Sequence, residues 1–318
     1  GGWCFYDKDY NEQILEPELI KQNEITDEVF KKNTHILEIN SKSGLYALYC
    51  AYSVYRTRSK LELGPKPPRE MGIDLWKKIL AENIFLICKT PMAKRIAQRT
   101  LAGFTGTKVN AHYFEDLVNQ LKNKPENFIN KVSKTNYWKK DGNEDMKFDA
   151  IVGNPPYQEE SDTNGRKTPI YNLFMDAAFK LSNIVSLITP ARFVFNAGET
   201  PKDWNNQILN DEHFSVVSYW PKSSDVFPTV EIKGGVAVTL RIQQRCFGKI
   251  GIFTAYNELN EILQKVTAYE NTKSFMDSIS DGCFLKNTAP LPKYGSKYVW
   301  CGGIRSTSLS AILHLLPG

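Results

Sequence analysis

The sequence lacks the paired cysteines and histidines of a metal site. None of its six cysteines forms a Cys-x-x-Cys pair, and they are spread widely along the 318 residues. His112 and His213 likewise show no ligand spacing. This pattern indicates neither a zinc site nor a disulfide framework, so we expect no metal and a reducing, cytoplasmic compartment.

Long apolar runs are missing as well. The longest run falls far short of the about 20 apolar residues that span a bilayer, and the start has no basic stretch followed by an apolar one. We therefore expect no membrane partner. The chain begins without a methionine and stops soon after an apolar stretch, so we expect it to be a piece of a longer protein.

Composition places the chain among globular proteins without naming a ligand. At 42% hydrophobic and 24% charged residues, it can form one large core, or one core and a smaller domain. A net charge of +5 and a pI near 8.7 are compatible with a nucleic-acid partner but do not require one.

The most informative stretch is 148–157, which reads Phe-Asp-Ala-Ile-Val-Gly-Asn-Pro-Pro-Tyr. An apolar run of strand length ends at a glycine, and Asn154, Pro155, Pro156 and Tyr157 follow. Ligands bind at this edge of open α/β sheets. Two prolines fix φ and donate no N–H, so nearby acceptors would be held in a rigid turn that suits an exocyclic amine. The alternative is a proline pair that merely ends a strand.

This stretch resembles the Asn-Pro-Pro-Tyr motif of adenine-specific DNA methyltransferases, which methylate an amino nitrogen with S-adenosylmethionine (SAM). The resemblance runs in register from about residue 15 to residue 245 and includes segments 191–198, 204–214 and 225–238. It is similar to the modification module of type II restriction–modification methylases in which the cofactor motif precedes the catalytic motif and a recognition domain comes last.

The resemblance implies double-stranded DNA as the partner and a flipped adenine as the target. Asn154 and the Pro155 carbonyl would each accept one amino hydrogen, and Tyr157 would stack on the base, a contact worth about 1–3 kcal/mol. Phe227 would face the extruded base, with a core aromatic as the alternative, and Lys233 belongs to a family-like segment on the substrate side.

A strand, a turn and a helical pattern at 35–55 occupy the place of the family's first SAM-binding motif. The usual form is an acidic residue followed by a glycine-rich loop, which Glu38 and Gly44 match. Asn40 belongs to the same loop. Lys42 stands where a glycine is expected, and its side chain would crowd the methionine moiety.

Three further residues hold cofactor positions by the resemblance. The counterpart of Thr26 helps to hold the methionine end of SAM, although Thr26 could instead be a helix N-cap. Cys88 and Lys89 stand where an acidic residue usually binds the ribose. Asp116 lies near the position where the family often has an acidic residue that faces the adenine of SAM. The alternative is an acidic residue in the first turn of a helix.

Strands alternate with helical patterns along the chain. We therefore predict an α/β, Rossmann-like SAM-dependent methyltransferase fold with a mostly parallel sheet, helices on both faces and a C-terminal hairpin. Residues 1–245 would form this domain. Residues 246–318 would form an extension that begins a target-recognition domain.

Four local predictions complete the sequence interpretation. We expect a helix at 16–22, a basic, proline-rich surface loop within 56–69, a surface excursion at 122–146 and a loop at 158–167 that closes over a substrate. The alternative for the basic loop is a position near a phosphate backbone.

The leading hypothesis is a site-specific DNA adenine-N6 methyltransferase of a restriction–modification system. Three alternatives stay open. The same tetrapeptide serves methyltransferases that act on RNA or on a protein glutamine. Altered cofactor residues would fit a non-catalytic DNA-binding module. A nuclease outside this chain would make a bifunctional enzyme.

Overall fold

The computed structural model describes most of the chain before residue 257 and divides it into two units, Gly1–Ala255 and Tyr256–Gly318. The described residues are 2–6, 13–21, 23–140, 145–160, 167–256, 258–259 and 262. Most of 246–318 lies outside them from 257 onward, so its assignment to a recognition domain stays a prediction. No helix within the described ranges is long and apolar enough to cross a membrane.

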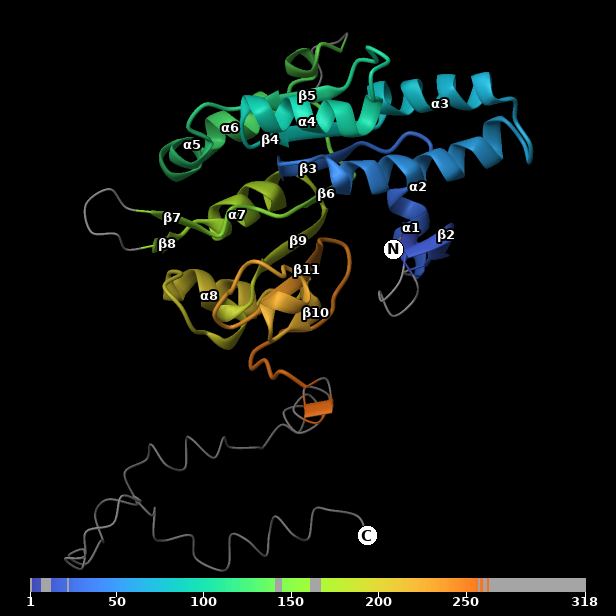
Figure 1. The fold of residues 1–318 in the computed structure, drawn as a ribbon. Helices are drawn as coiled ribbons and strands as arrows, with labels where there is room; N and C mark the ends of the chain where they lie inside the picture. Colours follow the sequence, from blue (N-terminus) through green and yellow to red (C-terminus); the bar gives the residue numbers. More distant parts are fainter. Residues whose placement is uncertain are drawn as a thin grey trace, which may run out of the picture. The chain divides into compact units, whose positions relative to one another are not determined.

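The first unit is built around a seven-stranded sheet (Figure 1). The strand order is β10-β11-β9-β6-β3-β4-β5. Strands β3, β4, β5, β6 and β9 are parallel, whereas β11 is antiparallel to both β9 and β10. The predicted mostly parallel sheet with a C-terminal hairpin is confirmed. The strands are β3 (Ile36–Ser41), β4 (Ile84–Cys88), β5 (Asn110–Tyr113), β6 (Ala150–Gly153), β9 (Ile184–Pro190), β10 (Phe214–Trp220) and β11 (Val236–Ile242).

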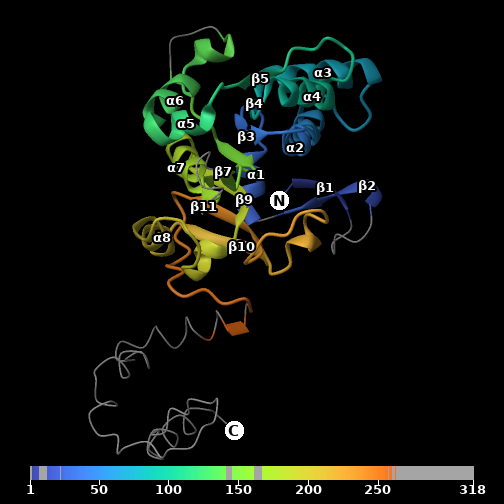
Figure 2. The same ribbon diagram turned by 60° about the vertical axis from the view of Figure 1, so that its left-hand side comes forward.

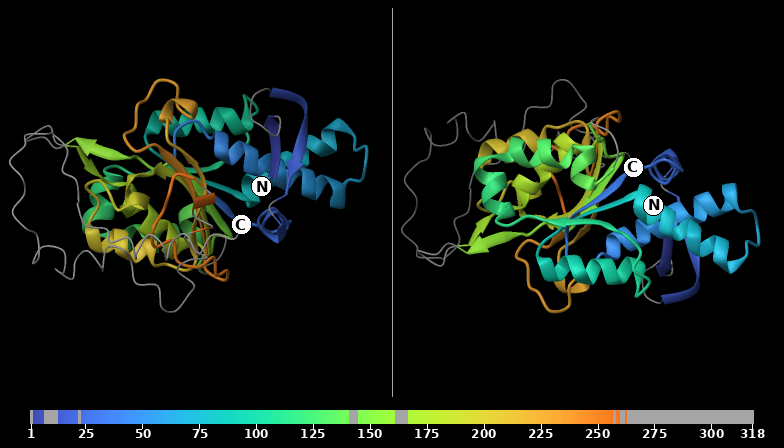
Figure 3. Two further views of the ribbon diagram at one scale, coloured as in Figure 1. Left: turned by 90° about the horizontal axis from the view of Figure 1, so that it is seen from below. Right: turned by 90° about the horizontal axis from the view of Figure 1, so that it is seen from above.

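Helices cover both faces of the sheet (Figures 2 and 3). One core cluster contains Ala51, Ile79 and Ala97 from α2, α3 and α4, while the other contains Phe128 and Phe174 from α6 and α7. Strands β3 and β4 are buried along their whole length, as expected for parallel strands between two helical layers. The helices are α2 (Leu45–Glu62), α3 (Arg69–Glu82), α4 (Pro91–Ala102), α5 (Leu117–Asn123), α6 (Pro125–Val132), α7 (Tyr171–Leu181) and α8 (Lys202–Leu209).

The predicted helix at 16–22 is wrong. Residues Gln13–Ile20 form β2, which pairs antiparallel with β1 (Gly2–Tyr6), and the first helix is α1 (Asn23–Val29). Helix propensity is a weak signal, and pairing with a distant strand overrides it. The Trp3 N–H donates to Ser53 Oγ of α2 at 3.0 Å, which fixes the two-stranded sheet to the domain.

The predicted surface excursion at 122–146 is wrong as well. Helix α6 and the 3₁₀ helix η1 (Thr135–Trp138) place Phe128 and Trp138 in the core, where each is at most 1% exposed. Lysines and asparagines dominate the composition of this segment, but they lie between its apolar residues. The spacing of the apolar residues, rather than the overall composition, correctly indicates that this segment packs into the core.

The predicted basic loop within 56–69 is partly wrong, because 56–62 belongs to α2 and 69 begins α3. The Arg58 side chain is only 1% exposed. Its Nε donates to Glu62 Oε1 at 2.8 Å, and its Nη1 donates to Glu82 Oε2 and Asn83 Oδ1, each at 2.9 Å. Arg58 therefore joins α2 to α3 and is not available to a phosphate.

Replacing Arg58 by alanine should leave this buried network without its cation. We expect Arg58→Ala to lower the free energy of unfolding by about 3 kcal/mol, measured by urea denaturation. The exposed Lys60 of the same helix is the control, and Lys60→Ala should stay within about 0.5 kcal/mol of the parent. Equal effects of the two substitutions would contradict the assigned role of Arg58.

Gly153 provides a second test, because β3 passes unusually close to it. A Cβ built on Gly153 would lie 2.4 Å from the backbone oxygen of Ile39. We expect Gly153→Ala to cost about 3 kcal/mol of stability, because two backbone strands must separate. Gly64→Ala meets no atom within 4 Å and should cost only about 1 kcal/mol, from its left-handed φ. Denaturation curves showing the two variants equally stable would rule out this packing constraint.

Candidate active site

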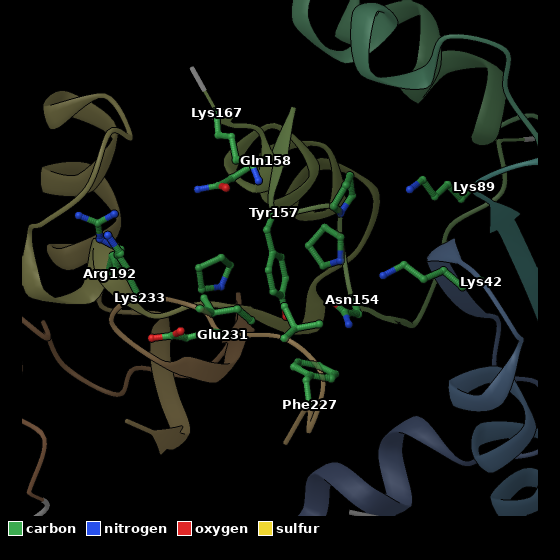
Figure 4. A pocket seen from close by; sticks show the side chains of 15 residues that line it. Lys42, Lys89, Asn154, Tyr157, Gln158, Lys167, Arg192, Phe227, Glu231 and Lys233 are labelled. Carbon is green, nitrogen blue, oxygen red and sulfur yellow. The ribbon is translucent and has the colours of Figure 1, made fainter. Parts of the chain in front are cut away.

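The parallel strands β3, β4, β6 and β9 bring four residues to one edge of the sheet. Asn40, Lys89, Asn154 and Arg192 lie at or just beyond the carboxyl ends of these strands. A cavity of about 630 Å³ opens at this edge (Figure 4). Its walls consist of Lys42, Lys89, Asn154, Pro155, Pro156, Tyr157, Gln158, Lys167, Pro190, Arg192, Phe227, Val230, Glu231, Ile232 and Lys233.

The loop after β3 touches the turn after β6 directly. Ile39 and Gly153 are paired in the sheet, so Asn40 and Asn154 follow side by side. Asn40 Nδ2 donates to the Asn154 carbonyl oxygen at 2.8 Å. Asn40 adopts a left-handed backbone with φ 59°, a conformation that asparagine tolerates better than most residues. The expected cofactor loop and the expected catalytic turn are therefore adjacent.

Two polar atoms of the turn are buried without a partner. Asn154 Oδ1 and the Tyr157 hydroxyl make no hydrogen bond to any residue that the structure describes. A buried polar atom left unpaired costs about 1–3 kcal/mol. Burial raises the pKa of Tyr157 above its ordinary value, so its hydroxyl stays protonated. Asn154 thus lines the cavity and carries an acceptor that no described residue satisfies, while its side chain also makes a hydrogen bond with Tyr46.

Glu38 is buried and holds the start of α2. Its side chain is 3% exposed, and Oε2 accepts a hydrogen bond from the Ala47 N–H at 2.8 Å. Burial raises the pKa of the Glu38 carboxyl. Gly44 precedes α2 with φ 76°, and a Cβ there would lie 3.0 Å from Ala97. Glu38 and Gly44 therefore fix the start of α2 and do not line the cavity.

Lys42 and Lys89 bring positive charge to one side of the cavity (Figure 4). The Lys89 N–H donates to the Ser41 oxygen at 2.9 Å, which holds the two loops together. Burial, followed by the nearby Lys89, lowers the pKa of Lys42. Cys88 is fully buried, and burial raises the pKa of its thiol to about 12. Lys89, rather than Cys88, faces the cavity.

Two predicted cofactor residues lie away from the cavity wall. Thr26 is 4% exposed and lies inside α1, which begins at Asn23, so its interpretation as an N-cap is wrong. Asp116 is exposed and precedes α5, and its Oδ2 accepts from Asn119 Nδ2 at 2.7 Å. Neither residue contributes to the wall of the cavity.

The predicted substrate residues do reach the cavity. Phe227 and Lys233 both line it, on the segment that joins β10 to β11. Phe227 is half-buried and belongs to neither core cluster, so its interpretation as a core aromatic is wrong. Figure 4 shows Phe227 near Tyr157 and Asn154, with Lys233 beside Arg192.

Sequence reasoning missed several residues of the wall, of which Arg192 is the clearest. It follows Pro190, the last residue of β9, and so obeys the same edge rule that singled out Asn154. Gln158 and Lys167 belong to the short strands β7 (Gln158–Glu160) and β8 (Lys167–Pro169). Residues 161–166 between them lie outside the described residues, so a loop that closes over the substrate stays a prediction.

Comparison with known proteins points to one family. A family model described as Eco57I restriction-modification methylase matches residues 82–227, which include Lys89, the Asn154 turn, Arg192 and Phe227. A Mycoplasma pneumoniae protein described as an uncharacterized adenine-specific methylase is 28% identical over 137 residues. That alignment covers 42% of this chain and 32% of the relative, so the chain spans about a third of the relative's length.

Solved structures resemble the chain more distantly. A nuclease-deletion mutant of the type ISP restriction-modification enzyme LlaGI, in complex with a DNA substrate mimic, has a TM-score of 0.46 at 9% identity and covers 78% of this chain and 25% of its own. A putative RNA methyltransferase from Pyrococcus horikoshii has a TM-score of 0.33 at 13% identity, covering 66% and 76%. With both scores below 0.5, the fold rests on this chain's own strand order.

The family match spans the part of the chain that carries most of the cavity wall, including the whole Asn154–Tyr157 turn. The loop after β3 lies outside the matched range. The resemblance suggested by the sequence is thereby confirmed, and the family that residues 82–227 match is that of the Eco57I restriction-modification methylases.

Proposed function

We propose that this chain is the catalytic part of a SAM-dependent DNA adenine-N6 methyltransferase of a restriction–modification system. One observation carries the proposal: Asn154 Oδ1 is a buried, unpaired acceptor beside the proline pair at the wall of the cavity. A rigid acceptor without a partner suits a ligand that brings N–H donors. The amino group of adenine is such a ligand, and the family match supports it.

The residues around the loop after β3 fit SAM at its methionine end. Lys42 and Lys89 offer two cations that would hold the carboxylate. SAM supplies an electrophilic methyl group on a sulfonium when bound.

The residues of the turn would prepare the target nitrogen. Asn154 Oδ1 and the Pro155 carbonyl would accept the two amino hydrogens, which draws the nitrogen lone pair out of conjugation with the ring. Tyr157 would stack on the base and Phe227 would close the cavity beside it. Extrusion of the base from duplex DNA costs a few kcal/mol, and the stacking and hydrogen bonds in the cavity would contribute a stabilisation of about the same size. The cationic product nitrogen would then lose its proton to solvent.

Substitution of Asn154 tests this assignment. Asn154→Ala should reduce methyl transfer by about 100-fold or more, comparable to the loss of one preorganised polar group in other enzymes. Stability should fall by only about 1 kcal/mol, because Oδ1 has no partner to lose and the side chain makes a single hydrogen bond, with Tyr46. Transfer of radiolabelled methyl from SAM to mixed genomic DNA measures the effect.

The exposed Asn206 of α8 is the matched control, and Asn206→Ala should leave transfer unchanged. Transfer by Asn154→Ala at the parent rate would refute the proposed role of Asn154. If the protein methylates RNA or a protein glutamine but not DNA, the proposed DNA substrate is wrong.

Tyr157 gives an independent test of stacking. Its hydroxyl has no hydrogen-bond partner among the described residues, so Tyr157→Phe should keep near-parent transfer. Tyr157→Ala removes the ring and should lose about 5- to 150-fold, the equivalent of 1–3 kcal/mol. Steady-state rates at saturating SAM provide the comparison. If both variants behave alike, the ring has another role.

Lys42 and Cys88 favour a second candidate, a DNA-binding module that does not catalyse transfer. The family's glycine and acidic residue are absent at these positions, and Cys88 is buried and uncharged. Calorimetry with SAM separates the two candidates: saturable binding supports the enzyme, and no binding at millimolar SAM supports the module.

A further inference from the structure

Arg192 is held at the cavity by a fixed backbone. It begins the 3₁₀ helix η2 (Arg192–Phe195), and both neighbouring residues, Ala191 and Phe193, are 0% exposed. The Ala191 N–H donates to the Gly235 oxygen at 3.0 Å, and the Arg192 oxygen accepts from Ala197 at 3.0 Å. With core residues on either side, the backbone cannot turn the Arg192 side chain away from the cavity wall.

Two glycines pack against the stem of Arg192. A Cβ built on Gly234 would lie 2.4 Å from Arg192 Cγ, and one built on Gly198 would lie 3.4 Å from Arg192 Cβ. Both glycines have left-handed φ values, 85° and 97°. Any larger residue at 234 would push the arginine stem aside, so the chain makes room for this side chain.

No acidic residue that the structure describes forms an ion pair with Arg192. Arg192 and Lys233 both line the cavity and appear on the same side of it in Figure 4, and neither makes an ion pair or hydrogen bond with another described side chain. Glu231 is the one acidic residue of the wall, and it is exposed and joined to neither cation. Two like charges side by side repel one another and together attract an anion.

We propose that Arg192 is a phosphate clamp, which binds the backbone phosphate next to the adenine nucleotide held in the cavity. This inference rests on the proposed function, since it concerns the same cavity. The planar guanidinium matches a phosphate through two parallel hydrogen bonds. The Asn154 turn lies between the Arg192–Lys233 pair and the Lys42–Lys89 pair (Figure 4). A base stacked on Tyr157 therefore directs its phosphate to the arginine and leaves the lysines to the cofactor.

The test compares two short probes that differ only in charge. One is the trinucleotide d(TpApT), and the other is the same trinucleotide with neutral methylphosphonate links. Dissociation constants come from NMR titration of the full chain at low salt, without SAM. The parent protein should prefer the charged probe, and Arg192→Gln should lose about 10-fold of that preference, equivalent to about 1.4 kcal/mol.

The variants separate charge from packing. Glutamine keeps the Cβ, Cγ and Cδ atoms that pack against the glycines, so Arg192→Gln should fold normally. Arg192→Lys should retain part of the preference, because a cation remains on the same stem. The exposed Arg95 of α4 is the control, and Arg95→Gln should change nothing. Equal effects of Arg192→Gln and Arg95→Gln, or full loss in Arg192→Lys, would overturn the clamp.

Gly234 adds a coupling test. Gly234→Ala should displace the arginine stem and reduce the preference, and it should add nothing in an Arg192→Gln background. Additive losses would show that Gly234 acts through something else. This binding test does not depend on catalysis. If the preference for the charged probe depends on Arg192 but no methyl transfer occurs, the proposed function is overturned and the clamp stands. If methyl transfer occurs without that preference, the clamp is overturned and the proposed function stands.

Discussion

The close contact between β3 and β6 is the constraint on which the site depends. Gly153 lets the two backbones approach, and the Asn40 side chain then reaches the Asn154 carbonyl at 2.8 Å. The loop that would hold a cofactor and the turn that would hold a base are joined by this one register. If a cofactor and a base were bound at these two segments, they would already lie next to each other, which is the preorganisation that group transfer requires.

The cavity keeps polar groups that the protein itself does not satisfy. Most buried polar atoms in a folded protein find a partner, so an unpaired acceptor at Asn154 and an unbalanced cation at Arg192 are costs that folding alone does not repay. Both residues line the same cavity, and both would be satisfied by one kind of ligand. A nucleotide has N–H donors at one end and a phosphate at the other.

Local sequence patterns predicted the structure correctly where it depends on one strand and the residues that follow it. The apolar run before Asn154 and the edge rule predicted the turn, and the alternation of strands with helical patterns predicted the mostly parallel sheet. Local sequence patterns gave wrong predictions where the structure of a segment depends on residues far away in the chain. Residues 18–20 pair with residues 2–4, more than ten positions earlier, and Arg58 forms one of its two ion pairs with an acid on another helix. Thr26 and Asp116 were placed by resemblance alone, and the local backbone places both away from the wall.

Lys42 illustrates how a residue that breaks a pattern can still suit the site. A side chain at this position would obstruct a cofactor if it crossed the cavity, yet Lys42 is exposed and lies along the wall with Lys89. A positive sulfonium near two lysines is unfavourable, whereas a carboxylate near them is favourable. Burial and Lys89 lower the pKa of Lys42, and a carboxylate bound between the two lysines would oppose this shift. In the proposed function, Lys42 would therefore meet the carboxylate of the cofactor and not its sulfonium.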